Sequence, residues 1–188
     1  MAVVDIAGFV AALKEHAIEH KFHVHDERHF VETYTLKQNF EVDLHPESAC
    51  GEPLDLHLSL EVEPRVMLDF EDSVLAAEEG GEEPEDRYHL ALFFNWGLPP
   101  LANPPDLLIL ATELAGIGGT DLPMEVSAID STAPVSDAPE RRLSIVGRVD
   151  LSLYQVWNGE QPLCDVLDRA HAVSEFLLDR VEAWLGEV

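Results

Sequence analysis

Leu54-Asp-Leu-His-Leu-Ser-Leu-Glu-Val-Glu63 is the stretch that decides the fold, because apolar and polar side chains alternate strictly along it. Alternation with a period of two places the leucines on one side of a β-strand and the polar side chains on the other. Such a strand belongs to a sheet with one covered face and one solvated face, as is common in antiparallel sheets. We therefore predict an antiparallel sheet built around residues 54–63.

Further strands are predicted on both sides of this stretch. Residues 40–45 alternate in the same way, and residues 66–70 repeat the pattern after Pro64-Arg65, so residues 54–71 are expected to form an antiparallel hairpin. Residues 88–94 are apolar on both faces, which suits a central strand. Two more strands are predicted at residues 124–129 and 143–153, the second with a bulge or bend at Gly147.

Helices are predicted at both ends of the chain and near its middle. Residues 6–17 have apolar side chains at helical spacing after Asp5, a suitable N-cap. Residues 106–115, apolar on nearly all sides, predict a short buried helix that ends at Gly116. A long amphipathic helix is expected over residues 162–184, opened by Pro162 and closed by Gly186. The predicted fold class is α+β: one domain over residues 1–188, with an antiparallel sheet packed against N- and C-terminal helices and a short central helix.

Acidic residues dominate the charge, with 37 Asp and Glu against 11 Lys and Arg and a net charge of -26. Hydrophobic residues still make up 46% of the chain, enough for a core. Residues 41–86 hold sixteen acids and one base, and residues 71–87 are expected to be an acidic mobile loop. No nucleic acid or membrane partner is expected, because both bind basic surfaces. Salt adaptation, a basic partner or mimicry of DNA would each account for the acidity.

Targeting and redox signals favour a reduced, cytoplasmic protein. The first residues have no basic segment before their apolar stretch, which excludes a secretory signal, and no apolar run is long enough to span a membrane. Cys50 is expected in a loop and Cys164 on a helix, with no sign that they pair.

The sharpest chemical motif is His16-Ala-Ile-Glu19-His20, which has the H-x-x-E-H form of an inverted zinc-protease signature. In that signature two histidines one helical turn apart bind zinc and the glutamate is the general base. A further carboxylate ligand from a second long helix would be needed, and only the C-terminal helix could supply it. The alternative interpretation is that His16 and His20 are partly buried residues beside the apolar stripe of the first helix.

His23, His25 and His29 follow closely, so that five of the nine histidines lie within fourteen residues. On a strand, His23 and His25 would share one face as a pair of metal ligands. A solvated strand face or a pH-responsive cluster are the alternatives. Asp55 and His57 would also share a face and could pair, but no serine or cysteine stands at a recognisable nucleophile position. Residues 116–120 are rich in glycine but follow a helix and lack a lysine, which favours a helix C-cap over a phosphate loop.

The end of the chain has a series of elements found in a known architecture: the strand at residues 143–153, the turn Asn158-Gly159-Glu160 and the helix at residues 162–184. With the preceding order of helix, antiparallel strands, short helix and strands, it resembles the type III secretion chaperone-like architecture, which includes the YbjN-type sensory and regulatory proteins. Members of that group are small, acidic and non-catalytic, are often dimeric and bind partner polypeptides. The acidic insertion and the proline-rich connector at residues 98–105 depart from the pattern. The resemblance implies a protein partner and is compatible with a homodimer.

Two functional hypotheses follow. The first is a non-enzymatic acidic binding or chaperone-like module that engages a protein partner through a face of its sheet or helices. The second is a zinc-dependent hydrolase built on His16, Glu19 and His20. No catalytic residue and no cofactor are assigned, and the sequence leaves open which histidines bind a metal. The residues concerned are His16, Glu19, His20, His23 and His25.

Overall fold

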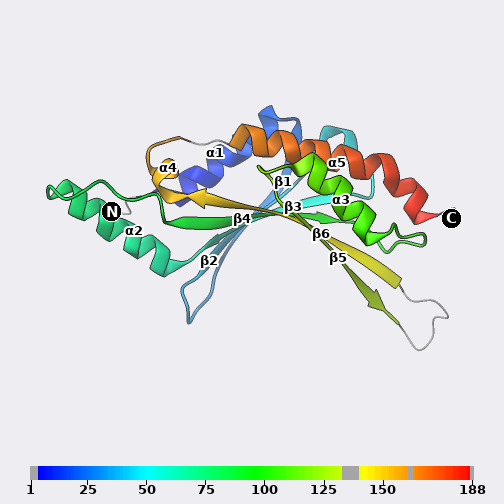
Figure 1. Cartoon of the computed structure of the whole chain (residues 1–188), viewed down its shortest axis with the longest axis horizontal. Helices are drawn as coiled ribbons and strands as arrows, with labels where there is room; N and C mark the ends of the chain where they lie inside the picture. Colours follow the sequence, from blue (N-terminus) through cyan, green and yellow to red (C-terminus); the bar gives the residue numbers. More distant parts are fainter. Residues whose placement is uncertain (1–3, 133–139, 161–162, 187–188) are drawn as a thin grey trace.

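A computed structural model describes residues 4–132, 140–160 and 163–186 of the chain (Figure 1). The chain contains both helices and antiparallel strands, as in an α+β protein. The elements are α1 (Ile6–Glu19), β1 (Phe22–Val31), β2 (Gln38–Pro46), η1 (Glu47–Ala49), β3 (Asp55–Val62), α2 (Pro64–Glu78), β4 (His89–Gly97), α3 (Leu107–Gly118), β5 (Met124–Ser131), β6 (Glu140–Ser152), α4 (Leu153–Trp157) and α5 (Leu163–Leu185).

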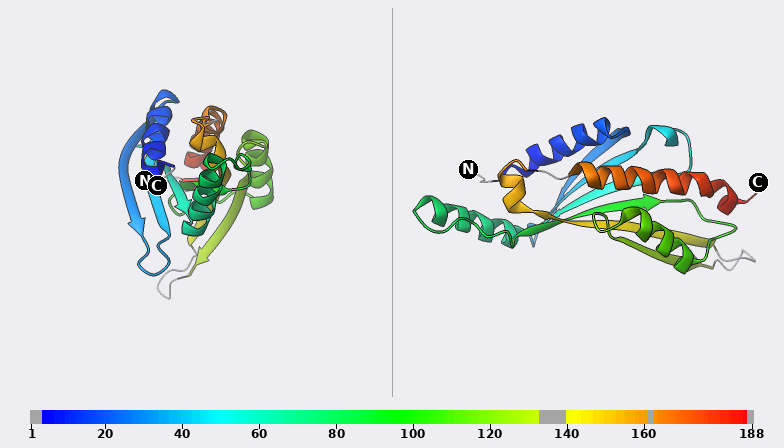
Figure 2. Two further views of the ribbon diagram at one scale, coloured as in Figure 1. Left: turned by 90° about the vertical axis from the view of Figure 1, so that its left-hand side faces the viewer. Right: turned by 45° about the horizontal axis from the view of Figure 1, so that its top comes forward.

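The six strands form one antiparallel sheet in the order β1-β2-β3-β4-β6-β5. Helices α1, α5 and α3 lie over one face of this sheet, and no helix of the described residues covers the opposite face (Figures 1 and 2). The predicted fold class, an antiparallel sheet packed against N- and C-terminal helices with a short central helix, is therefore confirmed.

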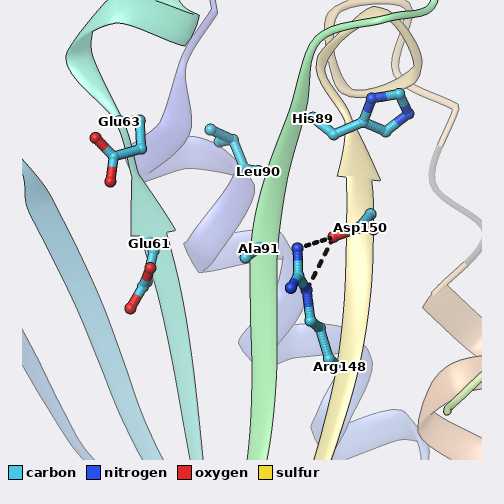
Figure 3. A pocket seen from close by; sticks show the side chains of 7 residues that line it. All are labelled: Glu61, Glu63, His89, Leu90, Ala91, Arg148 and Asp150. Carbon is cyan, nitrogen blue, oxygen red and sulfur yellow. Dashed lines mark hydrogen bonds and ion pairs between the residues drawn. The ribbon is translucent and has the colours of Figure 1, made fainter.

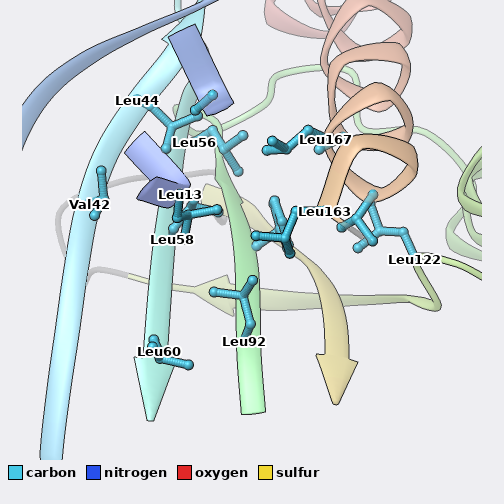
Figure 4. Close-up of a cluster of buried hydrophobic side chains, with 14 of the residues drawn as sticks. Leu13, Val42, Leu44, Leu56, Leu58, Leu60, Leu92, Leu122, Leu163 and Leu167 are labelled. Atoms are coloured by element: carbon cyan, nitrogen blue, oxygen red, sulfur yellow. The ribbon is translucent and has the colours of Figure 1, made fainter. Parts of the chain in front are cut away.

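The core lies between the covered face and the helices. Leu56, Leu58 and Leu60 of β3 are buried, and Leu163 and Leu167 of α5 approach them from the helical layer (Figure 4). Each fully buried leucine stabilises the fold by about 1.5–3 kcal/mol relative to an exposed one. The apolar side chains of the alternating stretch thus face this core, and its polar side chains face the side of the sheet without helices, here called the open face.

Two caps confirm the predicted starts of helices. The carboxylate of Asp5 accepts a hydrogen bond from the backbone N–H of Gly8 at 2.9 Å, and the carboxylate of Asp106 accepts from the N–H groups of Leu108 and Ile109. An acidic side chain at this position satisfies N–H groups that the first helical turn leaves unpaired.

The hairpin predicted over residues 54–71 is wrong in its second half, because residues 64–78 form helix α2. Val66, Phe70 and Val74 recur every four residues and share one helical face, on which Phe70 and Val74 are buried. The spacing of Val66, Leu68 and Phe70 fits a strand as well, but the helix leaves Leu68 exposed. The acidic loop expected at residues 71–87 is likewise wrong over residues 71–78, since the chain is helical to Glu78.

The central helix is longer and less buried than predicted. Helix α3 continues past Gly116 to Gly118 and ends at Gly119, whose φ of 63° suits a residue without a side chain. Leu108 and Ile109 are 77% and 61% exposed, so α3 has an outer apolar face as well as a buried one.

Gly147 does not mark a bulge, because the pairing of β6 with β4 continues through it without a shift, and the regular pairing with β5 ends at this residue. Its absent side chain instead makes room for Leu122: a Cβ atom at position 147 would lie 2.7 Å from Leu122 Cδ1. Strand β6 ends at Ser152 and is followed by α4, a short helix that the sequence did not indicate. Most of the loop expected between β5 and β6, and Pro162, lie outside the described residues.

Candidate functional site

The predicted zinc motif does not form a converging set of ligands. His20 follows the last turn of α1, and its Nδ1 lies 2.7 Å from Asp168 Oδ1 of α5. In the part of the chain that the structure describes, His16, Glu19 and His20 do not belong to a group of three residues whose potential ligand atoms approach one another. The zinc-hydrolase hypothesis therefore gains no support from this geometry.

A different histidine cluster forms where β1 and β2 pair. His23 lies directly opposite His45, so the two imidazoles share the open face. His25 falls at a shift in the register of β1, between Val24 and Asp26, and its Nε2 lies 2.7 Å from Nε2 of His45. His23 and His25 are therefore not a simple pair on a regular strand, and His45 stands between them in contact.

Cys50 completes this cluster from the turn after η1. Its Sγ lies 3.2 Å from Nδ1 of His23. The N–H of Glu47 donates a hydrogen bond to the carbonyl of Lys21 at 3.0 Å, which holds η1 beside the start of β1. His23, His45 and Cys50 are the one group of three His, Cys, Asp or Glu residues, among those described, whose ligand atoms all lie within 4.8 Å of one another.

His57 pairs across the sheet rather than with Asp55, which corrects the pairing suggested by the sequence. Its Nδ1 donates to Asp43 Oδ1 at 2.6 Å, and its Nε2 lies 3.5 Å from Glu41. Arg28 bonds to both of these carboxylates as well. Burial by itself would raise the pKa of Asp43, but the hydrogen bonds from Arg28 and His57 outweigh it and lower that pKa.

This network has no nucleophile aligned with its histidine. Ser59 lies on the same face of β3 as His57, but its hydroxyl donates to Asn39 Oδ1 at 2.8 Å. A serine triad needs the hydroxyl hydrogen-bonded to the free nitrogen of the histidine. The Asp43–His57 pair therefore connects neighbouring strands of the open face rather than activating a hydroxyl.

Much of the acidity on the open face is paired with cations. Lys37 bonds to Glu61 at 2.9 Å and to Glu63 at 3.0 Å, and Arg148 bonds to Asp150 at 2.9 Å. The hydrogen bond to Glu61, followed by that to Glu63, raises the pKa of Lys37. A hollow of about 380 Å³ lies among these side chains. Figure 3 shows its lining: Glu61, Glu63, His89, Leu90, Ala91, Arg148 and Asp150.

Helix α2 has a different surface, acidic and apolar at once. It extends beyond the end of the sheet (Figures 1 and 2) and is attached through Phe70, whose ring centroid lies 5.7 Å from that of Tyr88 and 6.3 Å from that of Trp157. On its outer side Leu68 and Leu75 are 58% and 51% exposed. Residues 64–86 contain nine carboxylates and one cation, so these leucines lie in the most acidic part of the chain.

Comparison with known proteins adds no relative. The chain matches no family model, no curated protein and no solved structure. The resemblance to the chaperone-like architecture consequently stays a prediction. Within the described ranges, no helix has the length and apolarity needed to cross a membrane.

Sequence reasoning missed His45 and Cys50 as neighbours of His23, and it missed the exposed leucines of α2. His45 was visible only as a polar residue of an alternating strand, and its position opposite His23 depends on the register of β1 and β2. The available sequence signal was the stretch of small and polar residues after residues 40–46, which indicates that the chain turns back there.

Proposed function

We propose that this chain is a non-enzymatic binding module that engages a partner protein through the outer side of helix α2. The observation that carries the proposal is the pair Leu68 and Leu75, exposed on a helix that extends beyond the sheet. They are seven residues apart and therefore lie on one stripe of the helix. Apolar residues at this spacing are the anchors with which an amphipathic helix binds a groove.

The negative charge around this stripe indicates which kind of partner surface would bind it. Asp69, Asp72 and Glu71 belong to the same helix, and five more carboxylates follow between Glu79 and Asp86. An acidic surrounding favours a partner whose apolar groove is bordered by lysine and arginine, because opposite potentials speed association and exclude wrong partners. A basic partner accounts for the excess of acidic residues beside the exposed leucines, whereas salt adaptation does not require acids at that place.

Photo-crosslinking from α2 identifies the partner and tests the proposal. The photoreactive residue p-benzoylphenylalanine replaces Leu75 in the full chain, and in a matched control it replaces Leu108, an exposed leucine of α3. The captured protein is then purified and its Kd for the wild-type chain is measured by fluorescence anisotropy. We expect capture from position 75 and not from position 108, and a Kd that rises with salt.

Variants decide whether the leucines carry the binding. Leu68→Ser with Leu75→Ser is expected to raise the Kd more than tenfold, since each leucine loses roughly 1 kcal/mol or more of further burial. Leu108→Ser with Ile109→Ser, a pair that is even more exposed, is expected to leave the Kd unchanged. Equal effects of the two pairs, or an unchanged Kd for the α2 pair, would refute the proposed surface. Hydrolysis of peptide or ester substrates at enzymatic rates by the purified chain would refute the non-enzymatic assignment.

A further inference from the structure

We propose that His23, His45 and Cys50 form a binding site for a divalent transition-metal ion, with Zn²⁺ as the best match to the ligands. The site is independent of the surface on α2. Imidazole nitrogen and thiolate sulfur are the donors that zinc takes in proteins, and three protein ligands leave a fourth position for water or another group.

The distances already approach those of a zinc centre. With Zn–N of about 2.05 Å and Zn–S of about 2.3 Å, tetrahedral geometry separates two nitrogens by about 3.3 Å and a nitrogen from a sulfur by about 3.6 Å. Nδ1 of His23 and Sγ of Cys50 are 3.2 Å apart, and all three ligand atoms lie within 4.8 Å of one another. His23 and Cys50 are exposed and His45 is half-buried, and small side-chain rotations, of roughly 1 Å at the ligand atom, would complete the arrangement.

A backbone hydrogen bond holds His45 in the tautomer that suits metal coordination. Its Nδ1 donates a hydrogen bond to the carbonyl oxygen of Pro46 at 2.8 Å, which places the proton on Nδ1 and the free lone pair on Nε2. A backbone carbonyl that accepts from the second nitrogen is the usual support of a metal-binding histidine. The carbonyl thus orients the ring and fixes the tautomer that a metal requires.

A carboxylate also lies near His23, outside hydrogen-bonding distance. Its Nε2 lies 3.8 Å from Glu47 Oε1, while its Nδ1 is the nitrogen next to Cys50. A carboxylate that accepts from the non-coordinating nitrogen would orient the ring, and a small movement of the Glu47 side chain would bring it within reach. Of the two histidines, His45 thus already has a hydrogen bond of the kind found behind metal ligands, and His23 has a carboxylate nearby.

His25 is hydrogen-bonded to Nε2 of His45, the nitrogen that would bind the metal. Because Nδ1 of His45 carries a proton, its Nε2 accepts, and the 2.7 Å contact is a hydrogen bond donated by Nε2 of His25. Binding of an ion to His45 replaces this hydrogen bond and releases the ring of His25. The released ring is a spectroscopic reporter of binding that a carboxylate site elsewhere on the protein would not affect.

The experiment uses the full chain, freed of metal and reduced with a phosphine that does not bind zinc. Zn²⁺ is titrated against a chromophoric chelator, and Co²⁺ is titrated with detection of the thiolate-to-cobalt charge-transfer band in the near ultraviolet. We expect one tight Zn²⁺ per chain and a Co²⁺ spectrum with that band. NMR signals of the imidazole protons of His23, His25 and His45 are expected to shift on addition of Zn²⁺.

Matched variants assign the ligands. Cys50→Ser and His45→Gln are each expected to weaken Zn²⁺ binding more than about 100-fold, beyond the effect of losing a supporting contact. Cys164→Ser and His29→Gln replace an exposed cysteine of α5 and an exposed histidine of β1, and they are expected to leave the affinity unchanged. Absence of tight stoichiometric binding, a Co²⁺ spectrum without the charge-transfer band, or equal effects of ligand and control variants would overturn the site. Far-UV circular dichroism checks that each variant is folded.

Discussion

Ser174 of α5 is hydrogen-bonded to the sheet inside the core. The indole N–H of Trp96 on β4 donates to its hydroxyl at 2.8 Å, and the hydroxyl donates in turn to the carbonyl of Ala170 at 2.9 Å. Ser174 is fully buried and Trp96 almost so. The hydroxyl is therefore the partner that lets an indole N–H lie in an apolar layer, and its removal by Ser174→Ala is a direct test of the packing of α5.

The expected cost follows from these contacts. A buried donor left without a partner costs about 1–3 kcal/mol, while alanine improves the helix propensity at this position by about 0.5 kcal/mol. The net loss in the free energy of unfolding is about 0.5–2.5 kcal/mol. For a chain of this length, that loss lowers the Tm by about 1–10 °C.

Urea denaturation followed by far-UV circular dichroism measures the effect without depending on tryptophan emission. Ser127→Ala, at an exposed position on β5, is the matched control and should change the stability by less than about 0.5 kcal/mol. In a Trp96→Phe background, which has no N–H to satisfy, Ser174→Ala should cost less than about 0.5 kcal/mol. An equal cost in both backgrounds would show that the hydrogen bond is not what Ser174 contributes.

Two further outcomes test the packing of β6 and the charges of the open face. Gly147→Ala should destabilise the fold by about 1–3 kcal/mol, because its Cβ would lie 2.7 Å from Leu122 Cδ1. This cost, measured by urea denaturation, should be smaller in a Leu122→Ala background. Strictly additive effects of the two substitutions would contradict the close approach. Asp43→Asn should be less stable than wild type at pH 7, because Arg28 and His57 lower the folded-state pKa of Asp43. That stability is present above the unfolded value of about 3.9 and is lost as the pH falls through the folded pKa, so the difference between the two proteins should vanish in acid. A difference independent of pH would exclude the carboxylate as its source.

The fold class could be predicted because the periodicity of apolar residues is a local property. The strict alternation of residues 54–63 has one structural solution, and the starts of α1 and α3 each have an acidic cap immediately before them. Residues 64–78 were mispredicted because Val66 and Phe70, four residues apart, fit either a helix or a strand, and Leu68 between them completes a short alternation. Burial of Phe70 against the distant rings of Tyr88 and Trp157 selects the helix, and those partners could not be known from local sequence.

The candidate sites were harder to predict from the sequence, because they too depend on residues that are distant along the chain. His23 was a candidate ligand from its spacing to His25, but its neighbours are His45 and Cys50, more than twenty residues away. Their approach depends on the register of β1 with β2 and on the hydrogen bond between Glu47 and Lys21. In the motif with the best local match, at residues 16–20, His20 contacts Asp168 of α5, but no three converging ligand atoms form there among the described residues.

The sequence by itself therefore determined the antiparallel sheet, its terminal helices and the acidic character of residues 41–86, all of which follow from the order of side chains along one segment. Tertiary structure alone decided which acids are paired, which leucines of α2 stay exposed and which histidines meet a cysteine. The physical reason is that periodicity fixes the face on which a side chain lies, whereas pairing and exposure depend on residues that only folding brings within contact distance.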